Sequence, residues 1–303
     1  MRICSLLPSA TEIVYALGLG ESLVAITHEC DFPPEASRLP AITRSALNHT
    51  SSTSLEIHSH VLSAVHQGSS IYHLDQEMLK ALNPDLILTQ ELCEVCAVSY
   101  REVRSAARVL EGDRRIVSLE PTNLAGMLDT IAMVGEITGT SQRAAQVISS
   151  LRERIQRVAA VARRAVSRPS VLALEWLDPP FIGGHWVPEM IRLAGGTDGI
   201  GEEGRYSETV PWERVAAYNP DVIVLMPCGF DLPRTLSEAQ RTPFPNAWSL
   251  LKAVRSRQVF AVNGSAYFAR PGPRLVDGLE IIAEILHPEL FARVRLGTDW
   301  RRS

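Results

Sequence analysis

An uninterrupted amphipathic segment, residues 140–167, lies near the middle of the 303-residue chain. Apolar side chains recur along it at alternating spacings of four and three, which places them in one stripe on a helix. These side chains belong to Ala144, Ile148, Leu151, Ile155, Val158, Ala162 and Ala165. Gly139 precedes the segment and Pro169 follows it, so we expect a helix of about 26 residues, roughly 39 Å long at about 1.5 Å per residue. Such a length is unusual inside one small domain, and we therefore predict a stiff connecting helix, residues 140–168.

The same pattern has a second interpretation, a coiled-coil segment that pairs two copies of the chain. The apolar stripe is short and rich in alanine, which favours a packed connector over a coiled coil. We therefore expect a monomer with an N-terminal lobe over residues 1–139 and a C-terminal lobe over residues 169–303.

Composition and charge narrow the function classes. The chain has 46% hydrophobic residues, enough for two cores, and a formal net charge of −4 without a long basic run. We therefore expect small molecules and proteins as partners and no nucleic acid. The start, MRICSLLPSATE, has no basic leader followed by a long apolar run, so the sequence as given predicts no export signal. Five cysteines, an odd number in a long chain, do not indicate a disulfide scaffold.

The two halves of the chain repeat one plan of short apolar strands and helices. In each half a helical stretch leads into an Asn-Pro-Asp unit, at Asn83 and again at Asn219, and an apolar strand follows each unit. Glu77 and Glu213 precede these two units by the same number of residues. A further helical pattern over residues 124–137 comes before the mid-chain segment.

This repeat predicts the fold class: α/β, with two Rossmann-like lobes joined by one long α-helix and a ligand cleft between the lobes. The polar stretch at residues 44–54 and the stretch WLDPPFIGGHW at residues 176–186 are predicted loops, and ligands gather at strand ends in open α/β sheets. The chain contains no GxGxxG, Walker A, GxSxG or HExxH motif, which argues against the enzyme classes that carry them.

Several stretches together resemble the class III substrate-binding proteins of ABC importers. They are SLLPSATEIVYALGLG at residues 5–20, the two Asn-Pro-Asp units, DPPF at residues 178–181 and the single mid-chain helix. The resemblance implies a helical-backbone binding protein, not an enzyme, that carries vitamin B12, a ferric siderophore or haem to ABC permease subunits.

The stretches DPPF and SAYFARPGPR, the latter at residues 265–274, look closest to the vitamin B12-binding branch. The resemblance therefore implies a corrinoid (cobalamin-like) ligand, a metal chelate, and no catalytic cofactor. Two features depart from the family. Ala266 stands where B12-binding relatives commonly have an aspartate, and the family's export signal is not found. The sequence thus leaves two locations open, the family's extracytoplasmic one and a cytoplasmic one.

Aromatic residues fall in or beside loops on the predicted cleft side, where a flat macrocycle needs apolar ring surface. The candidate ligand-binding residues are Phe32, Tyr72, Trp176, Phe181, Trp186, Tyr206, Tyr267 and Phe268, with Arg270 for acidic or amide groups. A single loop aromatic is usually only packed. Trp176, Phe181 and Tyr267, however, lie in or beside the stretches that carry the resemblance.

Cysteine and histidine side chains follow two of the predicted strands. Cys93 and Cys96 come directly after one strand, and His28 and Cys30 after another, so we predict that the four converge as ligands of a metal. A lone C-x-x-C fits a redox pair, a disulfide or packed structural residues equally well.

Glu77 and Glu213 occupy equivalent places in the two halves. The resemblance implies that glutamates at these positions dock onto arginines of the two permease subunits. The alternative is that each glutamate merely stabilises the start of its helix through the helix dipole.

Two other function classes stay open on the sequence. One is a cytoplasmic enzyme or carrier of tetrapyrrole or metal metabolism that uses His28, Cys30, Cys93 and Cys96. The other is an interaction protein that has lost its ligand.

Overall fold

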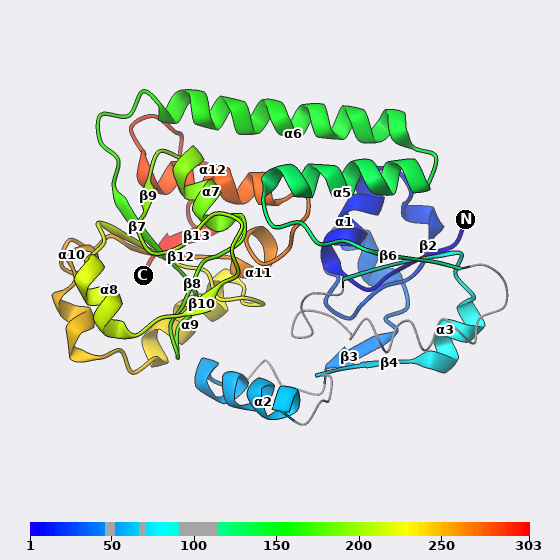
Figure 1. The fold of residues 1–303 in the computed structure, drawn as a ribbon, viewed down its shortest axis with the longest axis horizontal. Helices are drawn as coiled ribbons and strands as arrows, with labels where there is room; N and C mark the ends of the chain where they lie inside the picture. The colour runs from blue at the N-terminus through cyan, green and yellow to red at the C-terminus, as the bar shows by residue number, and fades with distance from the viewer. Residues whose placement is uncertain (46–51, 67–70, 91–113) are drawn as a thin grey trace. The chain divides into compact units, whose positions relative to one another are not determined.

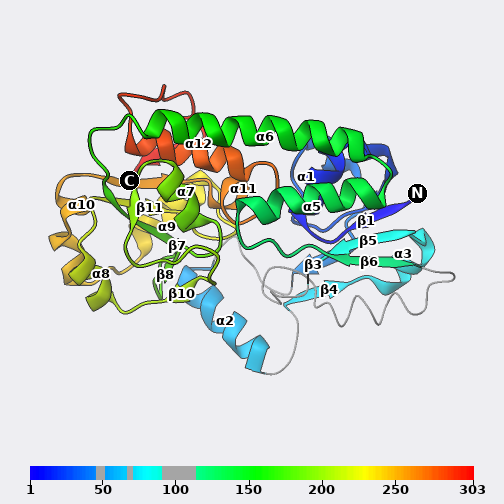
Figure 2. The same ribbon diagram turned by 45° about the horizontal axis from the view of Figure 1, so that its top comes forward.

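The computed structural model describes residues 1–45, 52–66, 71–90 and 114–303 (Figures 1 and 2). The chain forms two compact units, which are treated one at a time. Unit 1 comprises Met1–Ser52, Glu56–Pro121 and Ala125–Ser149. Unit 2 comprises Thr53–Leu55, Thr122–Leu124 and Ser150–Ser303.

Unit 1 is built on a four-stranded sheet with the strand order β2-β1-β5-β6, in which every pair is parallel. Its strands are β1 (Ile3–Ser5), β2 (Leu23–Ala25), β5 (Leu86–Thr89) and β6 (Arg115–Ser118). Among the described residues, the helices wholly or mainly in this unit are α1 (Pro8–Ala16), η1 (Gly20–Ser22), η2 (Pro34–Arg38), α2 (Ser54–His66), α3 (Gln76–Leu82) and α5 (Leu124–Ile137). The central strands β1 and β5 are buried along their whole length, as their unbroken apolar sequences predict.

A two-stranded antiparallel ribbon accompanies this sheet. It consists of β3 (Thr43–Ser45) and β4 (Tyr72–Leu74), with Ser45 opposite Tyr72. Tyr72 and Leu74 join the core cluster that also contains Ile87 of β5.

Unit 2 contains a seven-stranded sheet with the order β10-β8-β7-β11-β12-β13, and β9 pairs with β7 off this path. The strands are β7 (Ser170–Trp176), β8 (Phe181–Ile182), β9 (Thr197–Asp198), β10 (Glu208–Thr209), β11 (Val222–Leu225), β12 (Val259–Val262) and β13 (Trp300–Arg302). The helices are α7 (Val187–Leu193), α8 (Trp212–Tyr218), α9 (Leu232–Arg241), η3 (Asn246–Leu250), α10 (Lys252–Arg255), α11 (Gly264–Tyr267) and α12 (Leu275–Leu286). Strands β7, β11 and β12 are mutually parallel and form the centre of the sheet.

The long helix α6 spans Ser141–Ala162 and belongs to unit 1 up to Ser149 and to unit 2 beyond it. In unit 1 it packs closely on α5, because a Cβ at Gly135 would lie only 2.5 Å from the Cβ of Ala144. In unit 2, α12 lies beside its second half (Figures 1 and 2).

Helix α6 ends earlier than the sequence pattern predicts. Its last buried side chain is Ala162, the following N–H groups make tight turn bonds to Val161 and Ala162, and Val166 is fully exposed. With no surface left to pack against, the chain leaves the helix before Pro169 would require it to.

The repeated Asn-Pro-Asp unit ends a helix in the same way in both units. Asn83 after α3 and Asn219 after α8 adopt left-handed backbone conformations, with φ of 43° and 47°. Asparagine tolerates this conformation better than most residues, and the proline that follows cannot continue the helix.

The aspartate of each unit then binds the neighbouring strand. Asp85 accepts the N–H of Arg2 at 2.7 Å, just before β1, and Asp221 accepts the N–H of Ser170 at 2.8 Å, at the start of β7. The sequence repeat therefore marks one structural device, which sets the register of a central parallel pair in each unit.

The predicted α/β class is confirmed, whereas two predicted loops contain strands. Residues 176–186 include β8, and residues 44–54 begin within β3. Both strands are only two or three residues long, too short for an apolar pattern to predict them. No helix of the described residues is long and apolar enough to cross a lipid bilayer.

Candidate ligand-binding site

A short hairpin at the carboxyl end of β7 brings Trp176 and Phe181 together. Strand β8 turns back antiparallel on β7, with Trp176 opposite Phe181. The ring of Phe230, in the loop before α9, lies 5.4 Å from the Trp176 ring. Two of the predicted ligand-binding aromatics thus share one end of the sheet of unit 2.

The first residues of α2 are part of unit 2 and orient Trp176. The indole N–H of Trp176 donates to the carbonyl oxygen of Ser54 at 3.1 Å. The backbone N–H and the hydroxyl of Ser54 donate to Glu238 at 2.6 and 2.7 Å, and both residues are about 1% exposed. Arg234 lies 3.5 Å from the other Glu238 oxygen and 4.7 Å from the Phe230 ring. Sequence reasoning missed Ser54 and Glu238, because they are 184 positions apart.

Glu175, next to Trp176 on β7, is a third residue that the sequence analysis missed. Its carboxylate accepts the hydroxyl of Ser207 at 2.5 Å and the backbone N–H of Gly184. Burial raises the pKa of Glu175 to about 7, although these two hydrogen bonds act to lower it. No cation of the described residues pairs with it. The signal was present in the sequence as one acidic residue inside the apolar run SVLALEW.

The predicted residue Tyr267 lies on α11, after β12, and is anchored by its hydroxyl. This group donates to Asp299 at 3.0 Å, and burial together with the Asp299 charge raises the pKa of Tyr267 to about 12. The guanidinium of Arg274 lies 5.8 Å from the ring centre. The ring of Tyr267 is therefore held in place by contacts within unit 2.

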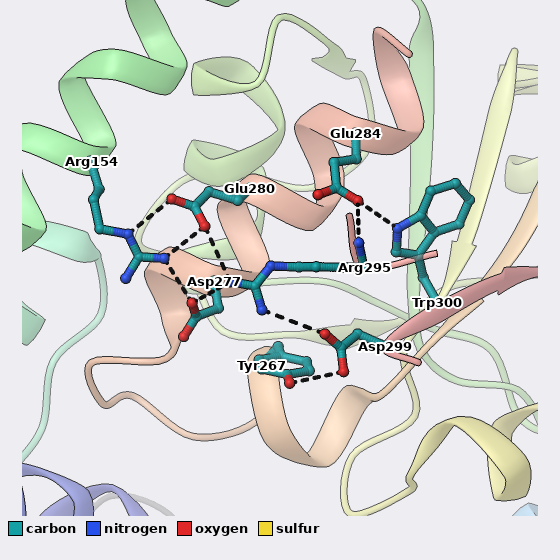
Figure 3. Close-up of polar contacts among 8 residues, drawn as sticks. All are labelled: Arg154, Tyr267, Asp277, Glu280, Glu284, Arg295, Asp299 and Trp300. Atoms are coloured by element: carbon teal, nitrogen blue, oxygen red, sulfur yellow. Dashed lines mark hydrogen bonds and ion pairs between the residues drawn. The ribbon is translucent and has the colours of Figure 1, made fainter. Parts of the chain in front are cut away.

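Asp299 belongs to a network of ion pairs between α6, α12 and the C-terminal segment (Figure 3). Asp277 accepts from Arg154 at 2.7 Å and from Arg295 at 2.6 Å, and Glu280 binds Arg154 through both carboxylate oxygens. Burial acts to raise the pKa of Glu280, but the hydrogen bonds and charges of Arg154 and Arg295 together outweigh it, so the net shift is downward. We name these five residues, Arg154, Asp277, Glu280, Arg295 and Asp299, the α6–α12 network.

Of the other predicted ligand-binding residues in unit 2, three are buried and Tyr206 is exposed. Trp186 donates its indole N–H to the carbonyl of Phe268 at 2.8 Å, and the two side chains are 8% and 1% exposed. Arg270 is also buried, at 8%. Tyr206 is exposed at 61% and its ring meets His185 edge-on at 5.1 Å. The structure therefore brings Trp176 and Phe181 together at the sheet end, while Trp186 and Phe268 contribute to the core.

The candidate residues of unit 1 have separate partners. His28 Nδ1 lies 2.7 Å from the Thr43 hydroxyl, and its ring is 5.5 Å from that of Tyr72, which is buried. The sulfur of Cys30 lies 3.0 Å from the Thr11 hydroxyl. Phe32 is 42% exposed.

The predicted metal site stays a prediction. Cys93 and Cys96 lie outside the described residues, and within the described ranges no three histidine, cysteine or acidic side chains are placed to hold a metal ion.

Glu77 and Glu213 lie in the first turns of α3 and α8. Both are exposed, and neither forms an ion pair with a described residue. Each carboxylate is thus accessible on its own unit, as the docking hypothesis requires, and each also stands where it favours the helix dipole.

A family model described as "periplasmic binding protein" matches residues 3–266. The chain belongs to this family. Among the relatives of this periplasmic binding protein are the "Uncharacterized ABC transporter substrate-binding lipoprotein YvrC" of Bacillus subtilis and a vitamin B12-binding protein of Vibrio cholerae. The first is 24% identical over 297 residues, 96% of this chain and 81% of the relative. The second is 26% identical over 289 residues, 94% and 88% of the two chains.

Solved structures agree with this fold. The vitamin B12-binding protein BtuF of Vibrio cholerae superposes with a TM-score of 0.68 at 24% identity, and covers 95% of this chain and 96% of its own. A periplasmic haem-binding protein of Pseudomonas aeruginosa gives 0.72 at 19% identity, with 95% and 93% covered. The named relatives are substrate-binding transport proteins and not enzymes, so the prediction of a non-enzymatic periplasmic binding protein is confirmed.

Proposed function

We propose that this protein binds a corrinoid, or a closely related metal chelate, and presents it to an ABC permease outside the cytoplasm, as a monomer. The observation that carries the proposal is the pair Trp176 and Phe181 at the carboxyl end of β7. Such strand ends are where open α/β sheets bind ligands, and aromatic rings suit the faces and rim of a flat macrocycle. The vitamin B12-binding relative, which matches 94% of this chain, supports a corrinoid as the ligand.

Haem is the second candidate ligand, because solved structures with this fold include haem-binding proteins. A haem and a corrinoid share the flat, metal-bearing ring that aromatic side chains recognise. Direct comparison of ligands therefore decides between them.

Titration of the purified protein with aquocobalamin, cobinamide, haemin and a ferric siderophore tests this proposal. We expect tryptophan quenching with a Kd below about 10 µM for a corrinoid, roughly 7 kcal/mol of binding free energy. Trp176→Ala should weaken that binding about tenfold, since a ring contact contributes on the order of 1 kcal/mol. Trp248→Ala is the matched control, because Trp248 belongs to η3 and stacks on Phe244, not on the residues at this strand end.

If haemin is the only chelate that binds tightly, the ligand is haem and not a corrinoid, and the proposed transport function stands. The absence of binding by all four chelates would refute the proposed ligand class.

The role of Glu77 and Glu213 is tested by the double variant Glu77→Ala/Glu213→Ala. We expect importer-dependent uptake to fall about tenfold or more, because exposed charge pairs guide docking, while ligand affinity stays unchanged. Glu21→Ala/Glu202→Ala removes two other exposed glutamates and serves as the control. Normal uptake by the Glu77→Ala/Glu213→Ala variant would refute the docking role, and the two glutamates would then only stabilise the starts of their helices.

A further inference from the structure

Basic residues gather where the central strands of unit 2 begin. Because β7, β11 and β12 are parallel, their amino ends share one edge of the sheet, opposite to Trp176 at the end of β7. The segments that lead into β7 and β12, together with the C-terminal segment, supply exposed arginines at this edge. We name them the basic face: Arg163, Arg164, Arg168, Arg255, Arg257, Arg293 and Arg302.

An open groove of about 640 Å³ joins these segments into one surface. Ser167 from the segment after α6, Ser256 from the turn after α10, and Arg293 and Arg302 from the C-terminal part all line it. Figure 1 likewise shows α10 and the connection from α6 to β7 at the same end of unit 2. Residues far apart in the sequence therefore form one continuous patch.

The positive charge of this patch is not neutralised. Of the other charged groups that line the groove, Lys252 pairs with Asp221, and the single negative charge of Glu289 stands against the two positive charges of Arg293 and Arg302. None of the seven arginines forms an ion pair with a described residue. The chain as a whole carries a formal net charge of −4, so the basic face stands out against an acidic protein.

The helix dipole explains only part of this pattern. Arg163 and Arg164 follow the last residue of α6, where cations are favoured. Arg255 likewise ends α10, whereas Arg257, Arg293 and Arg302 have no such reason to lie at the same edge. A shared partner accounts for all of them.

Exposed aliphatic side chains lie among these arginines. Val166 is 105% exposed, Val294 77% and Leu296 47%, and Leu296 lines the groove. An interface that combines cations with exposed aliphatic groups suits the headgroup region of a membrane. The arginines surround an open groove and do not converge in a buried pocket, which disfavours a single small anion as the occupant.

We propose that the basic face binds the surface of a membrane that contains anionic phospholipid. The basic face follows from the chain's own charges, whereas the choice of a membrane as its partner rests on the proposed delivery function. Binding there would concentrate the protein near its permease and would leave the strand ends at Trp176 free for the ligand, since they lie at the opposite edge of the sheet.

Sedimentation of the full chain with vesicles tests the proposal. We expect the protein to sediment with equimolar phosphatidylcholine and phosphatidylglycerol, but not with phosphatidylcholine alone. Binding should be lost near 1 M NaCl, where the screening length is about 3 Å. The variant Arg163→Gln/Arg164→Gln/Arg168→Gln should bind at least about tenfold more weakly. The control, Arg38→Gln/Arg115→Gln/Arg241→Gln, removes the same charge from exposed arginines elsewhere and should bind normally.

Failure of the wild-type protein to sediment, or equal losses in the two triple variants, would overturn the basic face as a membrane site. Tighter binding to short duplex DNA than to the vesicles would also overturn it. Ligand affinity is measured on the same proteins and should be unchanged in both variants, so failure of the membrane proposal is distinguishable from failure of the proposed ligand.

Discussion

Arg154→Met is expected to lower the free energy of unfolding of unit 2 by about 2 kcal/mol, because it breaks the α6–α12 network. Arg154 donates three hydrogen bonds to Asp277 and Glu280, and their three side chains are 19–27% exposed. Without Arg154, two carboxylates on one face of α12 would share Arg295 alone (Figure 3). Loss of one partner leaves a partly buried charge uncompensated, which costs more than the pair itself contributes.

Urea unfolding followed by tryptophan fluorescence measures this effect, because all five tryptophans of the chain lie in unit 2. Arg152→Met is the matched control: it makes the same change on an exposed position of the same helix and should change stability by at most about 0.5 kcal/mol. If the two variants lose equal unfolding free energy, the loss comes from replacing any arginine on α6 and not from breaking the α6–α12 network.

Glu175→Gln is expected to remove a pH dependence of up to about 3 kcal/mol from the stability of unit 2. The pKa of Glu175 is raised from 4.5 to about 7 in the folded protein. Between these values the folded state therefore holds more protons than the unfolded state, so this carboxyl lowers stability progressively as the pH rises from 4.5 to 7. Below this window both states are protonated, and above it the loss is complete.

Glutamine keeps an oxygen that can accept from Ser207 and Gly184 but has no proton to lose. The difference in unfolding free energy between Glu175→Gln and the wild type should therefore grow from pH 4.5 to 7 and then level off. Glu208→Gln is the control, since Glu208 is exposed at 58% of its side chain. A difference that does not vary with pH would mean that Glu175 titrates normally in the folded protein.

Local patterns in the sequence were sufficient for several parts of the fold. Helix α5 has the bounds that its apolar periodicity predicts, Leu124–Ile137. The Asn-Pro-Asp units end helices and precede central strands as predicted, because left-handed asparagine and proline act on their own backbone. The end of α6 was not predictable in this way, since Ala165 continues the apolar spacing and only the packing surface runs out.

The candidate site was predictable only in part. Trp176 and Phe181 lie together at a strand end because they are close in the sequence. Trp186 and Phe268 look equivalent to them as loop aromatics, yet they are buried against each other from 82 positions apart. The sequence offers no local signal that separates an aromatic at a strand end from one in the core.

Periodicity and turn residues therefore suffice to predict the longer helices, the central strands and the α/β class, since each pattern acts within its own stretch of chain. The family was inferred separately, from the resemblance of several stretches taken together. Tertiary structure alone decides that Ser54 meets Trp176, that Arg154 meets Glu280 and that Ser54 meets Glu238. These partners are 122, 126 and 184 positions apart. The burial, charge and pairing of such groups depend on which distant parts of the chain come into contact. A single stretch of sequence does not determine these contacts.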